Sequence, residues 1–133
     1  MQSPAFRFVG RVLLVEDNSI NRLICKELLE RLGVQFEMAE DGVEALEKLG
    51  AAQFNLVLMD CLMPRLDGFA ATVQWREREK TEGRARTPIV AVSANATEDD
   101  RERCIASGMD DFLAKPIQLK ILAALIARYL PVA

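Results

Sequence analysis

Acidic residues directly follow two apolar runs of this sequence, and their carboxylates are the groups best placed to do chemistry. Residues 12–15 (Val-Leu-Leu-Val) end at Glu16 and Asp17, and residues 56–59 (Leu-Val-Leu-Met) end at Asp60. Continuous apolar runs of this length, bounded by turn signals, are typical of strands that are buried on both faces. The three carboxylates would then lie where two such strands leave the core.

A hydroxyl and an amine follow two later apolar runs in the same way. Residues 89–92 (Ile-Val-Ala-Val) end at Ser93, and the short run at 112–113 (Phe-Leu) leads into Lys115. In a parallel sheet the carboxyl ends of all strands lie along one edge, where ligands bind near a switch in strand order. We therefore expect four strands to deliver polar groups to one rim.

Strands and helical segments alternate along the chain. Phe36 and Met38 alternate with polar residues, as expected of a half-exposed edge strand, and apolar residues at helical spacing follow each strand. The predicted helices span 20–32, 41–50, a segment starting near 68, 97–107 and 118–130. This order predicts an α/β fold: a five-stranded parallel doubly wound sheet (flavodoxin-like, strand order 2-1-3-4-5) with helices on both faces. Residues 1–10 are interpreted as a leader or linker, 11–130 as the domain and 131–133 as a tail.

Local signals mark several helix ends. Gly33 is a good C-terminal stop, Asp41 can cap the second helix, and Thr97 with Asp100 resembles a capping box. The densely charged segment 76–87 is interpreted as a helix end followed by an exposed loop.

The apolar residues of three helices indicate which faces are buried. Phe69 and Val73 are expected on the inner face of the third helix. The fourth helix offers little to bury beyond Cys104 and Ile105, so we expect it to dock weakly. The last helix carries two apolar stripes, one facing the sheet and the other a candidate partner or dimer surface; the stripes are Leu119, Leu122 and Ile126, and Ile121, Leu125 and Tyr129.

Composition excludes several classes of protein. The chain has 133 residues, a net charge of -3, no histidine and three scattered cysteines. The acidic balance argues against a nucleic-acid-binding module, and no apolar run approaches the length of a membrane span. The cysteines form neither a zinc-binding pattern nor a disulfide framework, which favours a reducing, cytoplasmic setting. Because histidine is absent, the chemistry must rest on carboxylates, hydroxyls and lysine.

Three carboxylates at one rim require a cation. At 4 Å and an effective dielectric constant near 20, each pair of like charges costs about 4 kcal/mol. Oxygen ligands alone point to a hard divalent ion, Mg²⁺ first and Mn²⁺ as an alternative. Together with the Lys115 ammonium, the ion would balance the charge of Glu16, Asp17 and Asp60. Asp60 lies centrally among these groups and is the best candidate nucleophile for accepting a phosphoryl group.

The residues at these strand ends resemble those of response-regulator receiver domains, the CheY-like superfamily. Segments 12–17, 56–68, 88–94 and 110–116 look like the family's hallmark blocks, and the resemblance covers about residues 11–130. The Met-Asp-Cys-Leu-Met-Pro block is most similar to receivers of hybrid sensor histidine kinases.

The resemblance implies a role for each matching position. Asp60 would be the phosphoacceptor, Lys115 would contact the phosphoryl group, and Ser93 would be the switch hydroxyl. The implied metal ligands are Asp17, Asp60 and the backbone carbonyl of Leu62, with Glu16 acting mainly through water. Phe112 occupies the aromatic switch position, where tyrosine is common, so a switch that needs a phenol hydrogen bond is in doubt while rotation of the ring is not. The bond between Lys115 and Pro116 is expected to be cis.

The same resemblance implies partners but no stand-alone enzyme. The phosphoryl donor would be a phosphohistidine on a histidine kinase or histidine phosphotransfer domain, and the parent chain could be a hybrid kinase. Docking of the donor is assigned to the outer face of the first helix, near the rim, through Asn21, Arg22, Cys25 and Lys26. A homodimer through the fourth and fifth helices is a further expectation. Nucleic acid and membrane contacts are not expected.

Two other functions would also use acidic residues or a phosphate-binding loop at the ends of parallel strands. A Mg²⁺-dependent phosphatase or phosphotransferase with an Asp nucleophile typically needs a second acid two residues after the nucleophile, and that position is Leu62. Such enzymes also need a cap, for which no insertion is long enough. A flavodoxin-like cofactor binder would need a phosphate-binding loop after the first strand, and none is present. Cys61, next to Asp60, is interpreted as a small strand-end residue without a function.

Overall fold

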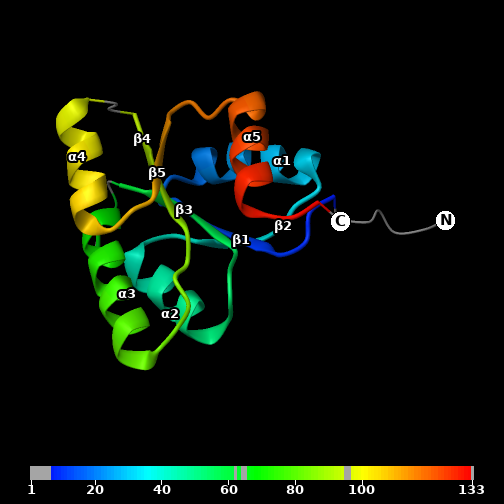
Figure 1. The fold of residues 1–133 in the computed structure, drawn as a ribbon. Helices are drawn as coiled ribbons and strands as arrows, with labels where there is room; N and C mark the ends of the chain where they lie inside the picture. The colour runs from blue at the N-terminus through cyan, green and yellow to red at the C-terminus, as the bar shows by residue number, and fades with distance from the viewer. Residues whose placement is uncertain (1–6, 62, 64–65, 95–96, 133) are drawn as a thin grey trace.

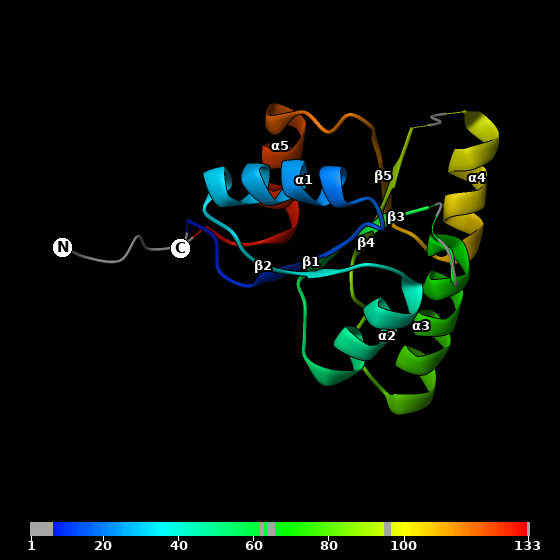
Figure 2. The ribbon, with the colours of Figure 1, turned by 180° about the vertical axis from the view of Figure 1, so that it is seen from behind.

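The computed structural model describes residues 7–61, 63, 66–94 and 97–132. Five parallel strands form one sheet in the order β2-β1-β3-β4-β5, which confirms the predicted fold. The strands are β1 (Arg11–Val15), β2 (Gln35–Ala39), β3 (Leu56–Asp60), β4 (Ile89–Ser93) and β5 (Asp111–Ala114). The helices are α1 (Ser19–Leu32), α2 (Gly42–Ala51), α3 (Gly68–Glu82), α4 (Glu98–Ser107) and α5 (Leu119–Tyr129). Helices α1 and α5 cover one face of the sheet, and α2, α3 and α4 cover the other (Figures 1 and 2).

The sheet separates two apolar cores because successive side chains of a strand point to opposite faces. Leu13 and Val15 of β1 pack with α2 and α3, whereas Val12 and Leu14 pack with α1 and α5. All five residues of the central strand β3 are buried. The continuous apolar runs in the sequence therefore correspond to strands covered on both sides.

The predicted helix ends are confirmed at several points. Gly33 ends α1 with a φ of 72°, a left-handed conformation that glycine adopts without strain. The Asp41 carboxylate accepts a hydrogen bond from the Glu44 N–H at 2.9 Å. At the start of α4, the Thr97 hydroxyl accepts from the Asp100 N–H at 3.2 Å, which confirms Thr97 as the cap. The same hydroxyl donates to the Asp100 carboxylate at 2.7 Å, whereas in a full capping box that carboxylate accepts from the backbone N–H of the cap residue.

Two expectations about helix faces are wrong. Val73 is exposed because the buried face of α3 runs through Phe69, Thr72 and Trp75, which leaves Val73 on the flank of that face. Ile105 is also exposed, and Cys104 is the buried residue of α4. Helix α4 thus buries even less than the sequence indicated.

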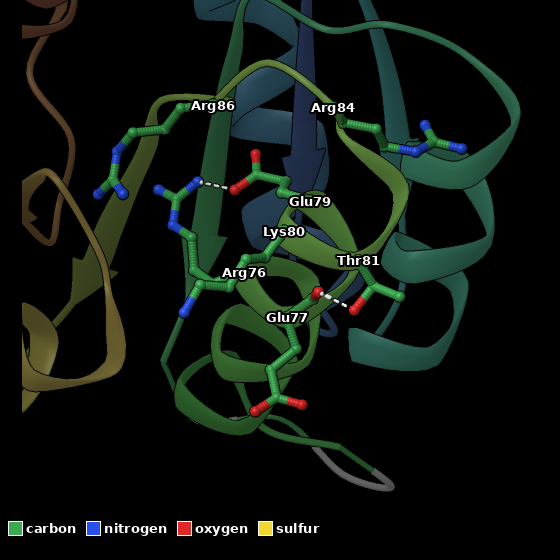
Figure 3. A pocket seen from close by; sticks show the side chains of 7 residues that line it. All are labelled: Arg76, Glu77, Glu79, Lys80, Thr81, Arg84 and Arg86. Atoms are coloured by element: carbon green, nitrogen blue, oxygen red, sulfur yellow. Dashed lines mark hydrogen bonds and ion pairs between the residues drawn. The ribbon is translucent and has the colours of Figure 1, made fainter.

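The charged segment 76–87 is a helix end followed by an exposed loop, as expected, but Glu79 and Thr87 within it are buried. The helix continues to Glu82, and the buried Glu79 carboxylate accepts hydrogen bonds from the Arg76 guanidinium at 2.8 Å and the Thr87 N–H at 2.6 Å. Arg76 also donates to the carbonyl of Gly108 and the carboxylate of Asp110. Arg76 and Glu79 line an open cavity of about 640 Å³ together with Glu77, Lys80, Thr81, Arg84 and Arg86 (Figure 3). The contacts of Arg76 and Glu79 lie at one wall of this cavity. They connect the end of α3 with the turn between α4 and β5.

The two ends of the described chain lie together. Phe8 forms an antiparallel bridge with Val132, and the Val9 N–H donates to the Pro131 carbonyl at 2.8 Å. Phe8 also packs against the core under α1 and α5. The division into leader, domain and tail stays a prediction. Across the described residues, no helix combines the length and the hydropathy needed to cross a bilayer.

Candidate functional site

Three carboxylates meet at the carboxyl ends of β1 and β3. Glu16, Asp17 and Asp60 each place one oxygen within 4.8 Å of the others. Glu16 and Asp60 are buried, whereas Asp17 is exposed. The expectation that parallel strands bring these side chains together is therefore met in the structure. We call these residues, with Lys115, the rim site.

Lys115 inserts its ammonium between two of the carboxylates. Its Nζ lies 2.8 Å from Glu16 Oε1 and 3.3 Å from Asp60 Oδ2. Burial alone would lower the pKa of Lys115, but the neighbouring Glu16 and Asp60 outweigh it and raise that pKa. Burial would likewise raise the pKa of Glu16, yet hydrogen bonds with Asp60 and Lys115 lower it. The site therefore favours a protonated Lys115 beside an ionised Glu16.

The backbone around the acids is held from two sides. Arg22 donates from Nη1 to the carbonyls of Glu16 at 2.9 Å and Asp17 at 3.0 Å. Gly68 contacts the Asp60 carbonyl so closely that a Cβ there would overlap it, and the same Cβ would lie 2.9 Å from Met59 Cγ. In the sequence, the pair Asp67-Gly68 is typical of a turn and a helix start. The second role of Gly68, which is to leave room for the backbone of Asp60, has no local sequence signal.

The backbone segment after β5 brings Lys115 into place. The backbone N–H of Lys115 donates to the Ser93 carbonyl at 2.9 Å. The expected cis bond between Lys115 and Pro116 is confirmed. Ser93 is the last residue of β4 and is buried beside Ala114. The fourth and fifth strands therefore deliver their polar groups to the same edge as β1 and β3.

Phe112 and Ser93 share one face of the sheet. Phe112 pairs with Ala91, which lies two residues before Ser93 on β4, and its half-buried ring packs on the core under α3 and α4. The Arg101 guanidinium of α4 lies over this ring, with its Cζ 5.5 Å from the ring centroid. The ring is thus in contact with α4 and lies on the same sheet face as Ser93, one residue pair earlier on that face.

Some predicted site positions lie outside the described residues or carry no reactive group. Leu62, with its carbonyl predicted to bind the metal, is outside the described part of the chain. Cys61 is buried, and burial together with Cys104 and Asp60 raises the pKa of its thiol to about 12. A thiol that stays protonated is a poor nucleophile, in agreement with the interpretation of Cys61 as a structural residue.

The outer face of α1 differs from the expected one. Cys25 is buried against the sheet, and Arg22 is held by the backbone carbonyls of Glu16 and Asp17. Three apolar side chains are exposed instead, Ile20 at 68%, Leu23 at 62% and Ile24 at 50%. We call these three residues the α1 patch. Beside it lies a cavity of about 340 Å³ that reaches the rim site and is lined by Glu16, Asn21, Ile24, Cys25, Ala94, Lys115, Pro116 and Ile117.

The second apolar stripe of α5 is largely covered. Leu125 is buried with Leu122 and Ile126 against the sheet, and Ile121 is the exposed apolar residue of that stripe. A surface for self-association would therefore combine Ile121 with the half-buried Phe112 rather than use a continuous stripe along α5.

The donor atoms of the rim site suit a small divalent cation. The converging side chains offer carboxylate oxygens, and two of the three acids are already buried beside an ammonium group. Glu16, Asp17 and Asp60 could hold Mg²⁺, which takes few protein ligands and keeps several waters. The exposed Asp17 leaves a side of the cluster open to solvent and to an incoming group.

Known proteins support the same interpretation. Residues 12–127 match the family model of the response regulator receiver domain. Hybrid signal transduction histidine kinase B of Dictyostelium discoideum is 40% identical over 131 residues, which cover 92% of this chain and 7% of the relative. Sensor histidine kinase RcsC of Salmonella typhimurium is 39% identical over 118 residues, which cover 89% of this chain and 12% of the relative. The chain thus spans a small part of these curated relatives.

Solved structures agree. The receiver domain of sensor histidine kinase PA1611 from Pseudomonas aeruginosa has magnesium coordinated in its active site cleft. It is 38% identical with a TM-score of 0.81, covering 90% of this chain and 96% of that one. A second similar structure is a co-crystal of the Saccharomyces cerevisiae histidine phosphotransfer protein Ypd1 with the receiver domain of the response regulator Ssk1. The match has 32% identity and a TM-score of 0.87, and it covers 95% of this chain and 91% of the matched chain. The chain described here belongs to the response regulator receiver domain family.

Proposed function

We propose that this domain accepts a phosphoryl group from a phosphohistidine of a partner onto Asp60, in a Mg²⁺-dependent reaction. The observation that carries the proposal is the insertion of Lys115 Nζ between Glu16 and Asp60 within a cluster of three carboxylates. Three negative charges, one ammonium and one divalent cation sum to zero. Such a site is neutral before transfer, and the Mg²⁺ ion and the Lys115 ammonium would share the oxygens of the incoming phosphoryl group.

The chain's own residues account for the nucleophile and the orientation. A carboxylate oxygen of Asp60 would attack phosphorus while the bond from phosphorus to the imidazole nitrogen of the donor breaks. Lys115 already lies 3.3 Å from Asp60 Oδ2 and would donate to a phosphoryl oxygen after the transfer. When bound, Mg²⁺ would neutralise charge on the transferring group, which is much of what phosphoryl transfer requires.

Ser93 and Phe112 would carry the change away from the rim site. The Ser93 hydroxyl can donate to a phosphoryl oxygen, and its movement toward Asp60 would free space on the face that it shares with Phe112. Rotation of the ring into that space would alter the surface formed by α4, β5 and α5. The weakly docked α4 would respond most readily to this change.

The direct test is incubation with Mg²⁺ and acetyl phosphate, followed by mass spectrometry of the intact chain. We expect one phosphoryl group per chain, its loss in Asp60→Asn, and its loss when Mg²⁺ is chelated. Glu77→Gln is a matched control, because Glu77 is an exposed carboxylate in the second half of α3. Phosphorylation that persists in Asp60→Asn would contradict the proposal.

The alternative is a Mg²⁺-dependent phosphatase or phosphotransferase that uses Asp60 on small substrates. The same incubation separates the two functions. Rapid release of phosphate over many turnovers would indicate the enzyme, whereas one phosphoryl group held on the chain indicates the receiver. We expect the domain alone to catalyse only its own phosphorylation from small phosphodonors and its own dephosphorylation.

We further propose that the donor is a histidine kinase or histidine phosphotransfer domain that docks on the α1 patch. Ile20, Leu23 and Ile24 are exposed next to a cavity that leads to Lys115. An apolar patch beside a reactive site suits an amphipathic helix that carries the phosphohistidine. The Ypd1 complex of the similar Ssk1 receiver supports a partner of this kind.

Phosphotransfer rates test this docking surface. Leu23→Asp should slow transfer from a phosphorylated phosphotransfer domain at least tenfold and leave phosphorylation by acetyl phosphate unchanged, because Leu23 is exposed at 62% and is not part of the lining of the cavity that reaches the rim site. Ile121→Asp on α5 is the matched control, because Ile121 is similarly exposed at 51%. Equal slowing by both variants would argue against a specific role of the α1 patch. A homodimer through α4 and α5, a hybrid-kinase parent and a cytoplasmic location stay predictions.

A further inference from the structure

The aromatic switch position of this chain lacks a hydroxyl, and an arginine contacts its ring instead. Arg101, in the first turns of α4, places its Cζ 5.5 Å from the centroid of the Phe112 ring. The two residues, with Cys104, Ile105 and Met109, line a small hollow of about 170 Å³ between α4 and β5. A guanidinium over an aromatic face within about 6 Å is a cation–π contact.

We propose that Arg101 is a positioning residue that holds the Phe112 ring in the half-buried orientation described above. The proposal rests on the proposed receiver function, in which the ring turns toward Ser93. Such a turn takes the ring away from the surface hollow and therefore breaks its contact with Arg101. Arg101 thus stabilises one orientation of the switch and opposes the other.

The surroundings of the ring allow two orientations. Ala91, the β4 residue paired with Phe112, has a small side chain, and the next residue on the same face is Ser93. The ring is half-buried and borders hollows on both its α4 and α5 sides. A phenol would gain a hydrogen bond in one orientation, but Phe112 has only its apolar edge and its π face. The cation–π contact is the specific interaction that distinguishes the outer orientation.

Thermodynamic linkage gives the sign of the effect. A ligand that binds Asp60 and favours the inward orientation of the Phe112 ring must break the contact between this ring and Arg101. Removal of the contact therefore raises the apparent affinity of the domain for that ligand. An exposed cation–π contact is worth about a two- to fivefold change in an equilibrium. Arg101→Gln should therefore tighten binding of beryllofluoride, a phosphoryl mimic, by about that factor. Gln has a helix propensity close to that of Arg, so α4 itself should be little affected.

Helix α4 offers a matched control on the same element. Arg103, two residues further along α4, places its Cζ over a different ring, that of Phe69, at 4.1 Å from the centroid. Arg103→Gln removes the same charge from α4 and also breaks a cation–π contact. We expect it to leave the orientation of the Phe112 ring unchanged and to reproduce none of the tightening that Arg101→Gln causes through that ring.

The experiment has two readouts. The χ1 populations of Phe112 are measured by NMR couplings in the protein without added Mg²⁺, and beryllofluoride affinity is measured by titration with Mg²⁺ present. Arg101→Gln should shift the ring toward the inward orientation and tighten beryllofluoride binding, each by about two- to fivefold. In a Phe112→Leu background, which removes the π face, the substitution should change the affinity no further.

Each outcome decides a definite point. Unchanged ring populations in Arg101→Gln would overturn the proposal, as would an effect on affinity that survives in Phe112→Leu or is matched by Arg103→Gln. If the wild-type chain does not bind beryllofluoride, the proposed receiver function fails instead. The ring populations still decide the role of Arg101 in that case, because they are measured without the mimic.

Discussion

Removal of the Glu79 carboxylate should destabilise the domain strongly, although Glu79 is remote from the rim site. The Glu79 side chain is 7% exposed and that of Arg76 is 13% exposed. Glu79→Ala would delete an acceptor for the Arg76 guanidinium at 2.8 Å and for the Thr87 N–H at 2.6 Å. The N–H of the buried Thr87 would then lose this acceptor, and Arg76 Nη1 would keep only the Thr87 carbonyl at 2.8 Å among its acceptors in the structure.

The expected cost follows from these contacts. Breaking a buried ion pair by removing one partner costs about 3–5 kcal/mol. Arg76 would keep Asp110 at 2.9 Å and the carbonyl of Gly108, which places the cost near the lower value, about 3 kcal/mol. Domains of this kind are stable by only about 5–15 kcal/mol, so the loss is a large fraction of the total.

The single tryptophan makes the measurement direct. Trp75 is buried, and its indole N–H donates to the Thr87 hydroxyl at 3.4 Å, so its fluorescence reports on this part of the fold. With a urea m-value of about 2 kcal/mol/M, Glu79→Ala should lower the unfolding midpoint by roughly 1.5 M. Glu79→Gln keeps an acceptor for Thr87 and should cost less than half as much.

Glu77→Ala is the matched control on the same helix. Glu77 is exposed, and a surface substitution of this kind usually changes stability by about 0.5 kcal/mol or less. The reasoning is refuted if Glu79→Ala costs no more than Glu77→Ala. A lower midpoint with an unchanged m-value is the result that supports it, because a changed m-value would indicate an altered unfolded or native state.

Three further substitutions test other parts of the structure. Gly68→Ala should lower stability by about 1–3 kcal/mol in urea titrations and slow phosphorylation, because a Cβ would overlap the Asp60 carbonyl; Gly50→Ala, where only the flexible end of an arginine is in the way, should be tolerated. Asn18→Ala should cost about 1 kcal/mol in the same assay, because its side chain accepts from two N–H groups at the start of α1. Burial raises the pKa of the Cys25 thiol from 9.0 to about 11, so the fold retains a proton that the unfolded chain loses. Stability should therefore fall as pH rises from about 9 to 11, and by pH 10 the fall should be about 1 kcal/mol smaller in Cys25→Ala.

The strands and the rim site could be predicted because both depend on one-dimensional patterns. Continuous apolar runs identify strands covered on both faces, and a polar residue after each run marks where the strand leaves the core. Parallel topology then brings Glu16, Asp60, Ser93 and Lys115 to the same edge without further information about packing. The closeness of Lys115 to both Glu16 and Asp60 follows from that topology.

The faces of α1 could not be predicted in the same way. Ile20, Leu23 and Ile24 follow helical spacing, which normally indicates the buried side of a helix. The structure buries Cys25 and Leu29 instead, because the helix has more apolar residues than one face can cover. A sequence with two apolar stripes does not reveal which stripe meets the sheet, and only the packing against α5 and β2 decides it.

Long-range partners explain the other differences. Charged residues are mostly solvated, so the sequence of segment 76–87 indicates a helix end and an exposed loop but not the burial of Glu79. The partners of Arg76 include Gly108 and Asp110, which lie 32 and 34 residues further along the chain. No local pattern connects positions so far apart, and the same holds for the approach of Gly68 to the Asp60 carbonyl.

These contacts also explain how α4 can respond to the rim site without detaching from the domain. The turn that follows the helix is held firmly, because Arg76 and Arg86 both donate to the Gly108 carbonyl and both pair with Asp110. Cys104, in the second half of α4, is the buried residue of the helix, whereas the first half contacts Phe112 through the Arg101 side chain. Fixed points at one end and exposed contacts at the other favour a pivot near Gly108, so a change at Ser93 and Phe112 would displace mainly the N-terminal half of α4.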